Sequence, residues 1–320
     1  MAARLMPRLY RRQEEEFENN HEFTFATPDG NPPQLDINGM GLAFHAIEKL
    51  GPTTATTMLE QRRRSFDIDR YRQRHPALVA RREQDLQVLE RHLGRLPVSE
   101  VLPNSDREAA AFRPELVRRL DALPEQTFRS VEALVRRHRD PHDEFTFAAF
   151  DFIHAPGGHA PMVDFRDNPW LGEALHLARE NGVLISLICH APVGITSTWQ
   201  RIDGEGKAYR VAENQFLDAT ITVASKYGER AAESASYVHV PGERTRLTYY
   251  VDEALKEAGF MVRIAVNPSA VKLIYEPAVR LLTGNGPQAI DAQARKIRSI
   301  VPASPALNEG RRLKDGQLTA

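Results

Sequence analysis

The stretch "LISLICHAPVGI", from Leu184 to Ile195, decides the fold class of this chain. Five residues, four of them apolar, lead directly into Cys189 and His190, and small residues and a proline follow. A continuous apolar run of this length is typical of a strand that is buried on both faces of a parallel sheet. Because Pro192 suits the first turn of a helix, we expect the chain to pass from strand to helix at Cys189.

Apolar segments alternate with helical ones around this stretch. The sequence predicts strands over residues 145–155, 183–188, 218–225 and 260–266, and helices over 168–182, 190–199 and 251–259. Near the amino end it predicts a charged helix over 1–20, a strand and turn over 21–30, and a loop and helix over 34–51. Helices placed between short apolar strands predict an α/β fold with a mainly parallel sheet covered on both faces.

The composition is that of an ordinary globular chain. In its 320 residues, Lys+Arg 42 nearly balance Asp+Glu 43, so no overall charge attracts nucleic acid or anionic lipid. No apolar run approaches the roughly 20 residues that span a bilayer, and residues 1–16 do not resemble a signal peptide. A single cysteine cannot form an internal disulfide, which favours a reducing compartment. We expect a cytoplasmic protein that binds neither nucleic acid nor membranes.

The middle of the chain differs in composition from its flanks. Residues 62–143 are rich in arginine and carry leucines at helical spacing between Leu86 and Leu96, which predicts two to four amphipathic helices with breaks near Pro97, Pro103 and Pro124. Acidic residues are interleaved with the arginines, so we favour a solvated face over a nucleic-acid-binding one. The predicted organisation is a discontinuous α/β core of residues 1–61 and 144–300, a helical insertion over 62–143 and a loose tail over 301–320.

Cys189 allows two interpretations. A lone buried cysteine is often a small apolar core residue. In open α/β sheets, however, ligand sites lie at the carboxyl ends of parallel strands, where this cysteine is placed. A sharp turn from strand to helix would present the sulfur, and the amino end of the helix would favour its thiolate form. We therefore predict a nucleophile at Cys189.

A glycine pair follows the preceding predicted strand. In "APGGHAP", Gly157 and Gly158 form either a simple tight turn or a loop whose amide groups face a developing oxyanion. The position of the pair, about thirty residues before the cysteine, favours the second interpretation. We expect the Gly158 amide to act together with the amide of His190 or Ala191.

An acid–base partner for the sulfur is also available. His190 follows Cys189 directly and is the candidate base, with a solvent-facing ring as the alternative. An imidazole base works better when a carboxylate fixes its tautomer, and Glu229 follows the next strand where such a group could come from. Glu233 is the reserve candidate.

Other motifs carry less information. His159, Trp199 and Tyr249 are candidates to line a pocket, although for the two aromatic residues we favour the core. The cluster "HRDPHDE" (138–144) has metal-capable side chains without regular spacing, and we interpret it as a solvated loop. "NGMGLAF" (38–44) lacks the third glycine of a dinucleotide fingerprint. We predict neither a metal nor a cofactor.

Four segments together resemble a known family. "APGGHAPMVDF", "ISLICHAPVGI", "YYVDEALKEAGF" and "RLLTGNGP" occur in the order and spacing of the PfpI-type branch of the class I glutamine amidotransferase-like superfamily. They most resemble its group of stress chaperones and glyoxalase III enzymes, relatives of the parkinsonism-associated deglycase. The resemblance covers about residues 20–50 and 144–298. It implies a flavodoxin-like three-layer sandwich with Cys189, His190 and Glu229 as catalytic residues.

The resemblance also implies a reaction. A glyoxalase III-type enzyme converts a 2-oxoaldehyde such as methylglyoxal to a hydroxy acid without glutathione. The alternatives are a non-catalytic or holdase member of the family, with unfolded proteins as clients, and an amide hydrolase of the glutaminase type. Relatives suggest a homodimer. Two departures stand out: Ala191 replaces the glycine usual after Cys-His, and the position of a glutamate that contacts the nucleophile in relatives falls near Ala3, because the first predicted helix is not preceded by the usual strand.

Overall fold

The computed structural model describes residues 23–45, 60–61, 63–101, 106–234, 247–267 and 270–301. The predicted helix over residues 1–20, the position near Ala3 and nearly all of the predicted tail lie outside these residues.

The helices and strands fall into an amino-terminal part before about residue 140 and a carboxyl-terminal part after it. The amino-terminal part contains β1 (Phe25–Thr27), η1 (Ile37–Met40), α3 (Leu42–His45), α5 (Ile68–Arg74), α6 (Pro76–Leu93), α7 (Arg107–Asp121), β2 (Phe128–Ser130) and α8 (Val131–Arg139). The carboxyl-terminal part contains η3 (Phe147–Ala149), β3 (Phe152–Ala155), α9 (Pro161–Asp164), α10 (Pro169–Glu180), β4 (Leu184–Ile188), η4 (Ala191–Trp199), β5 (Gln200–Ile202), β6 (Ala208–Arg210), β7 (Thr220–Ile221), α11 (Lys226–Ser234), α12 (Val251–Glu257), β8 (Met261–Val262), β9 (Leu273–Glu276), η5 (Pro277–Val279), β10 (Leu281–Gly284), η6 (Pro287–Ala289) and α13 (Ile290–Ile300).

A four-stranded sheet with the order β3-β4-β10-β9 forms the centre of the carboxyl-terminal part. β3, β4 and β10 are parallel to their neighbours, and β9 pairs with β10 in antiparallel orientation. All five residues of β4 are buried, as the continuous apolar run predicts for an inner strand.

Helices cover both faces of this sheet, because successive residues of a strand point to opposite faces. Ile185 and Leu187 of β4 pack in one cluster with the α10 side chains, whereas Leu184 packs with Ala294 and Ile297 of α13. The described part of the chain is therefore a three-layer α/β structure with a mainly parallel sheet. The predicted fold class is confirmed.

Several elements differ in extent from their prediction. The strand expected over 145–155 is limited to β3, because three phenylalanines that precede it (Phe145, Phe147 and Phe150) pack edge to face on one another instead of alternating between faces. The helix expected over 190–199 is the 3₁₀ helix η4, in which the hydroxyls of Thr196 and Thr198 donate to carbonyls three residues back. The strands β7 and β8 are only two residues long.

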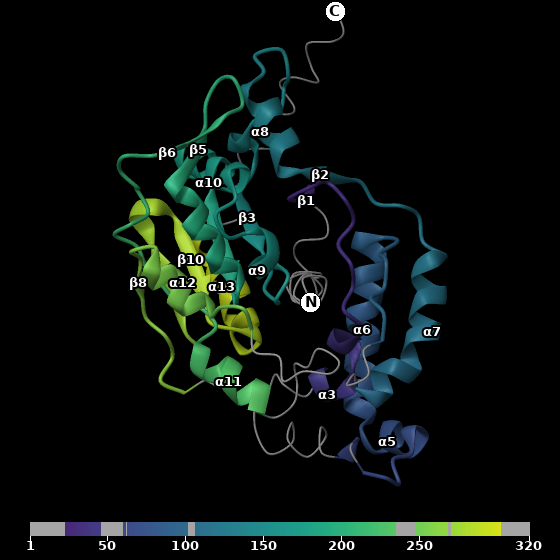
Figure 1. Cartoon of the computed structure of the whole chain (residues 1–320). Coiled ribbons are helices and arrows are strands. Elements are labelled where there is room, and N and C mark those ends of the chain that lie inside the picture. Colours follow the sequence, from purple (N-terminus) through teal and green to yellow (C-terminus); the bar gives the residue numbers. More distant parts are fainter. Residues whose placement is uncertain are drawn as a thin grey trace, which may run out of the picture.

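The helical segment packs with the amino-terminal residues. The leucines of α6 and the apolar face of α7 share one core cluster with Phe25, Leu35, Ile37 and Met40. β1 pairs in parallel with β2, and the rings of Phe25 and Phe128 lie 5.9 Å apart. The strand that we expected beside the core sheet thus has its partner in residues 62–143. Figure 1 shows α5, α6 and α7, in blue, beside the α/β part. The exact division into domains stays a prediction.

Among the described residues, the helices are too short or too polar for any of them to cross a lipid bilayer.

Candidate active site

Cys189 occupies a strained turn between β4 and η4. Its backbone has a φ of 64°, a left-handed conformation that a residue with a side chain adopts at a cost of about 1–2 kcal/mol. Two backbone hydrogen bonds maintain this turn: the Cys189 amide donates to the carbonyl of Gly284 at 2.8 Å, and its carbonyl accepts from the amide of Ala224 at 2.9 Å. The ends of β10 and of the segment after β7 therefore fix the position of the sulfur. Such strain is characteristic of residues at functional sites.

A chain of polar contacts leads from the sulfur to a carboxylate. The Sγ atom of Cys189 lies 3.2 Å from Nδ1 of His190, and Nε2 of His190 lies 3.0 Å from Oε1 of Glu229. Cys189 and His190 are buried, and Glu229 reaches them from the first turn of α11. The order of thiol, imidazole and carboxylate is that of a nucleophile with an oriented base.

The charges within this group support one another. Burial opposes the charged form of His190, but the sulfur of Cys189 and the carboxylate of Glu229 outweigh it and raise the pKa of His190 to about 10. Burial likewise opposes the ionisation of Glu229, and hydrogen bonds from His159 and His190 outweigh it and hold the pKa of this carboxyl well below its usual range. At neutral pH, His190 is therefore an imidazolium next to an ionised Glu229.

The glycine pair lies against the cysteine, as the sequence led us to expect. Both glycines are buried, and Gly158 has a φ of 109°, which favours glycine. A Cβ atom added to Gly157 would lie 2.3 Å from Cβ of Cys189, 2.8 Å from the carbonyl oxygen of Ile188 and 3.3 Å from the sulfur. Only glycine permits this close approach. The oxyanion role of Gly157, Gly158 and the buried Ala191 stays a prediction.

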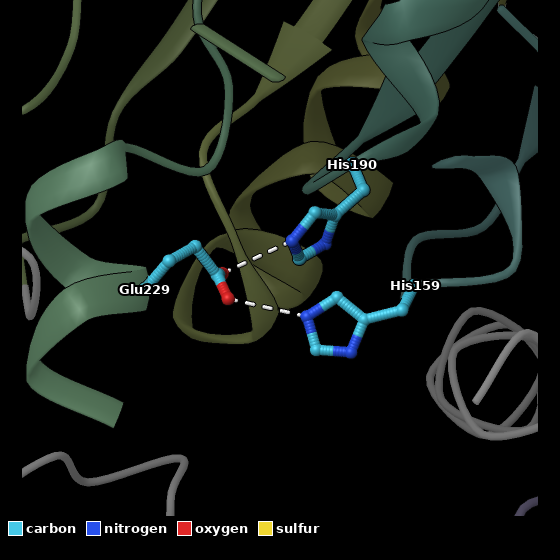
Figure 2. A group of neighbouring side chains, drawn as sticks. All are labelled: His159, His190 and Glu229. Carbon is cyan, nitrogen blue, oxygen red and sulfur yellow. Dashed lines mark hydrogen bonds and ion pairs between the residues drawn. The ribbon is translucent and has the colours of Figure 1, made fainter. Parts of the chain in front are cut away.

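His159 joins the group through the second oxygen of Glu229. Its Nε2 atom lies 3.1 Å from Oε2, and its ring lies 4.6 Å from the ring of His190, centroid to centroid. Figure 2 shows Glu229 facing the two imidazoles from one side, with one oxygen directed to each. From the sequence we expected His159 only to line a pocket, and its contact with Glu229 was not predicted. The position of His159 directly after the two glycines was the one available signal.

The remaining candidates have other partners. Trp199 donates from Nε1 to the carbonyl of Ala258, and Tyr249 donates from its hydroxyl to the carbonyl of Met162. Both rings pack against the main core cluster, and burial raises the pKa of Tyr249 to about 12. Their predicted pocket role is untested. Glu233 accepts hydrogen bonds from the Leu247 amide and the Tyr250 hydroxyl, whereas Glu229 contacts the histidines.

The same group could hold a metal ion, which the sequence analysis did not predict. Donor atoms of His159, His190 and Glu229 all lie within 4.8 Å of one another. In the loop "HRDPHDE", Asp143 pairs with Arg137, and His138 accepts from the amide of Phe147.

Comparisons with known proteins give distant likenesses in structure. No protein-family model and no curated protein matches the chain. The Rapid Encystment Protein 24 kDa of Francisella tularensis is similar at 17% identity with a TM-score of 0.41, over 64% of this chain and 76% of that one. Glyoxalase III from Candida albicans is similar at 14% identity with a TM-score of 0.36, over 50% of this chain and 61% of that one. Likenesses at this level establish neither a family nor an activity.

Proposed function

We propose that the protein is a cysteine-dependent enzyme of the glyoxalase III type, with Cys189 as its nucleophile. The observation that supports this most directly is the strained turn that places Sγ of Cys189 3.2 Å from an imidazole whose other nitrogen faces Glu229. Nδ1 of His190 is within reach to exchange a proton with the sulfur, and the deprotonated sulfur is the nucleophilic form of cysteine. An apolar core residue would need neither the strain nor the polar partners.

The reaction balances with water as the second substrate. The thiolate adds to the aldehyde carbon of a 2-oxoaldehyde, and His190 gives a proton to the new oxyanion, which forms a hemithioacetal. His190 then removes the hydrogen of that carbon and returns the proton to the oxygen of the neighbouring carbonyl, which receives the electron pair, so that an enediol forms. Loss of the proton of the first hydroxyl, together with protonation of the second carbon, gives a thioester of a 2-hydroxy acid. Water adds to the thioester, and cleavage of the carbon–sulfur bond releases the hydroxy acid and the thiolate.

In every step of this reaction, the role of Glu229 would be to keep the His190 ring in one orientation. A carboxylate that accepts from Nε2 keeps Nδ1 directed at the sulfur, where the proton is exchanged. The choice of 2-oxoaldehydes among possible electrophiles follows from the sequence resemblance. Membership of the PfpI-type family and the homodimer are proposals on the same basis. The cytoplasmic location is a proposal that rests on the single cysteine of the chain.

The test is the formation of lactate from methylglyoxal by the full chain, in the absence of glutathione. We expect Cys189→Ala to reduce lactate formation to the uncatalysed rate, and His142→Gln, at an exposed loop position, to leave it unchanged. Lactate formation that persists in Cys189→Ala, or its absence from the parent protein, would overturn the proposal. Ammonia release from glutamine by the parent protein would support the amide hydrolase instead, and suppression of client aggregation that persists in Cys189→Ala would support a holdase.

A further inference from the structure

We infer that His159, His190 and Glu229 form a binding site for a divalent transition-metal ion, with Zn²⁺ as the ion of best fit. The inference concerns binding and does not depend on the proposed reaction.

The three donor groups already lie close to one another. Nε2 of His190 and Nε2 of His159 face the two oxygens of the Glu229 carboxylate at 3.0 and 3.1 Å, and no two of the donor atoms are more than 4.8 Å apart. Donor atoms around a tetrahedral zinc ion, with bonds of about 2.1 Å, lie about 3.4 Å from one another. Each histidine nitrogen therefore already has nearly the required spacing to one carboxylate oxygen, and the two imidazoles must approach each other around the ion. Figure 2 shows both rings directed toward the same carboxylate.

The chemistry of the donors selects the kind of ion. Two imidazole nitrogens and one carboxylate oxygen suit zinc and neighbouring transition metals, whereas magnesium and calcium prefer oxygen donors throughout. Three protein ligands leave the fourth position of a tetrahedral ion open for water or a substrate oxygen.

The surroundings resemble those of a histidine metal ligand. In known sites, the ring nitrogen that does not bind the metal is usually fixed by an acceptor. Nδ1 of His190 lies 3.2 Å from the sulfur of Cys189, which is placed to accept a hydrogen bond from it. The Glu229 carboxylate also supplies a negative charge that a divalent ion would partly neutralise.

The site is open on one side. The side chain of His190 is 3% exposed and that of Glu229 is 15% exposed, whereas that of His159 is 35% exposed. An ion can therefore arrive from solvent at His159. The left-handed Gly158 precedes His159 directly and allows this backbone conformation, which aims the ring at Glu229.

Metal binding and the base function of His190 would exclude each other. With an ion on Nε2, neutral His190 carries its remaining proton on Nδ1, so it has no free nitrogen to accept a proton from Cys189 or a substrate. This consequence rests on the proposed function, and it makes zinc a reversible inhibitor of lactate formation.

Binding is tested by calorimetric titration of the tag-free, metal-stripped full chain with Zn²⁺ in a buffer that does not bind the ion. We expect one ion per chain. His159→Gln and Glu229→Gln each remove a donor and should weaken binding by about 100-fold or more. The control His142→Gln should bind as the parent does, because this histidine lies on an exposed loop. Binding by His159→Gln that equals that of the parent, or no binding by the parent, would overturn the inference.

Two further measurements separate this site from its alternatives. Cys189→Ser keeps all three donors and should weaken zinc binding less than His159→Gln does; if this variant loses binding while His159→Gln keeps it, the ion lies on the sulfur and the inference is wrong. In the parent protein, Zn²⁺ should slow the modification of His159 by diethyl pyrocarbonate and leave that of His142 unchanged. If diethyl pyrocarbonate modifies His159 at the same rate with and without zinc, the proposed site is contradicted. This measurement needs no variant. If the protein binds zinc but forms no lactate, the proposed function is overturned and the metal site is not.

Discussion

A methyl group at position 157 would enter the space next to Cys189, the proposed nucleophile. In Gly157→Ala, the added Cβ would lie 2.3 Å from Cβ of Cys189 and 2.8 Å from the carbonyl oxygen of Ile188. Carbon atoms in contact are about 3.5 Å or more apart, so the glycine turn and the cysteine turn must separate by about 1 Å. The turn at Cys189 resists this displacement, because its backbone is hydrogen-bonded to Gly284 and Ala224.

The size of the effect follows from this displacement. Overpacking of a close-packed region costs about 1–3 kcal/mol, so we expect the free energy of unfolding to fall by about that amount. A shift of about 1 Å at a reacting group lowers turnover by about 100-fold. The loss of activity should therefore exceed what partial unfolding explains, since a variant that loses 2 kcal/mol is still mostly folded.

The assays are urea unfolding and lactate formation from methylglyoxal. Gly204→Ala is the matched control, because no atom lies within 4 Å of the added Cβ and the backbone is not left-handed there. Cys189→Gly removes the nearest clashing atom, so Gly157→Ala should cost at least about 1 kcal/mol less in that background than in the parent. If Gly157→Ala matches the control in stability and turnover, the two turns do not touch and the geometry of the site is wrong.

Three further predictions concern buried polar groups. Glu229→Gln should lower turnover by about 100-fold or more, because the amide keeps only one of the two oxygens that face the imidazoles. Glu233→Gln, on the same helix, should leave turnover unchanged. Steady-state kinetics would show the difference, and equal rates for the two variants would contradict the proposed role of Glu229. Burial lowers the pKa of His154 to about 3 from 6.5, so the unfolded chain binds more protons between these values and stability falls as the pH falls. Between pH 8 and pH 5 the parent should lose about 2 kcal/mol more than His154→Asn in urea titrations, and parallel curves would exclude the effect. Glu173→Gln should lower the free energy of unfolding by about 2 kcal/mol, because the buried carboxylate pairs with Arg139 and Arg201; an unchanged urea midpoint would refute this.

The local parts of the site were predictable because neighbours in sequence stay neighbours in space. A buried strand that ends in Cys-His fixes where the sulfur and its imidazole lie, whatever the rest of the chain does. Glu229 was predictable for a related reason, since it begins the helix after the segment whose Ala224 bonds to the cysteine. In both cases the order of elements along a parallel sheet carried the information.

The parts that were missed depend on side-chain direction or on distant pairing. Whether His159 turns toward Glu229 is set by the backbone of the two glycines, and periodicity does not encode that conformation. β10, the neighbour of β4, was not predicted as a strand, because "LLTG" is short and ends in glycine. The pairing of β1 with β2 joins residues about a hundred positions apart, and it follows from the shared core rather than from any local pattern.

The source of charge stabilisation at the sulfur also differs from what the sequence suggested. We expected the amino end of a regular α-helix after Cys189 to favour the thiolate, through aligned backbone dipoles. The segment is instead the 3₁₀ helix η4, whose Thr196 and Thr198 hydroxyls bond to its own carbonyls. The full positive charge of His190 lies 3.2 Å from the sulfur, whereas a helix end contributes about half a charge even when it is regular. The reactivity of Cys189 should therefore depend on the pair of His190 and Glu229 far more than on η4.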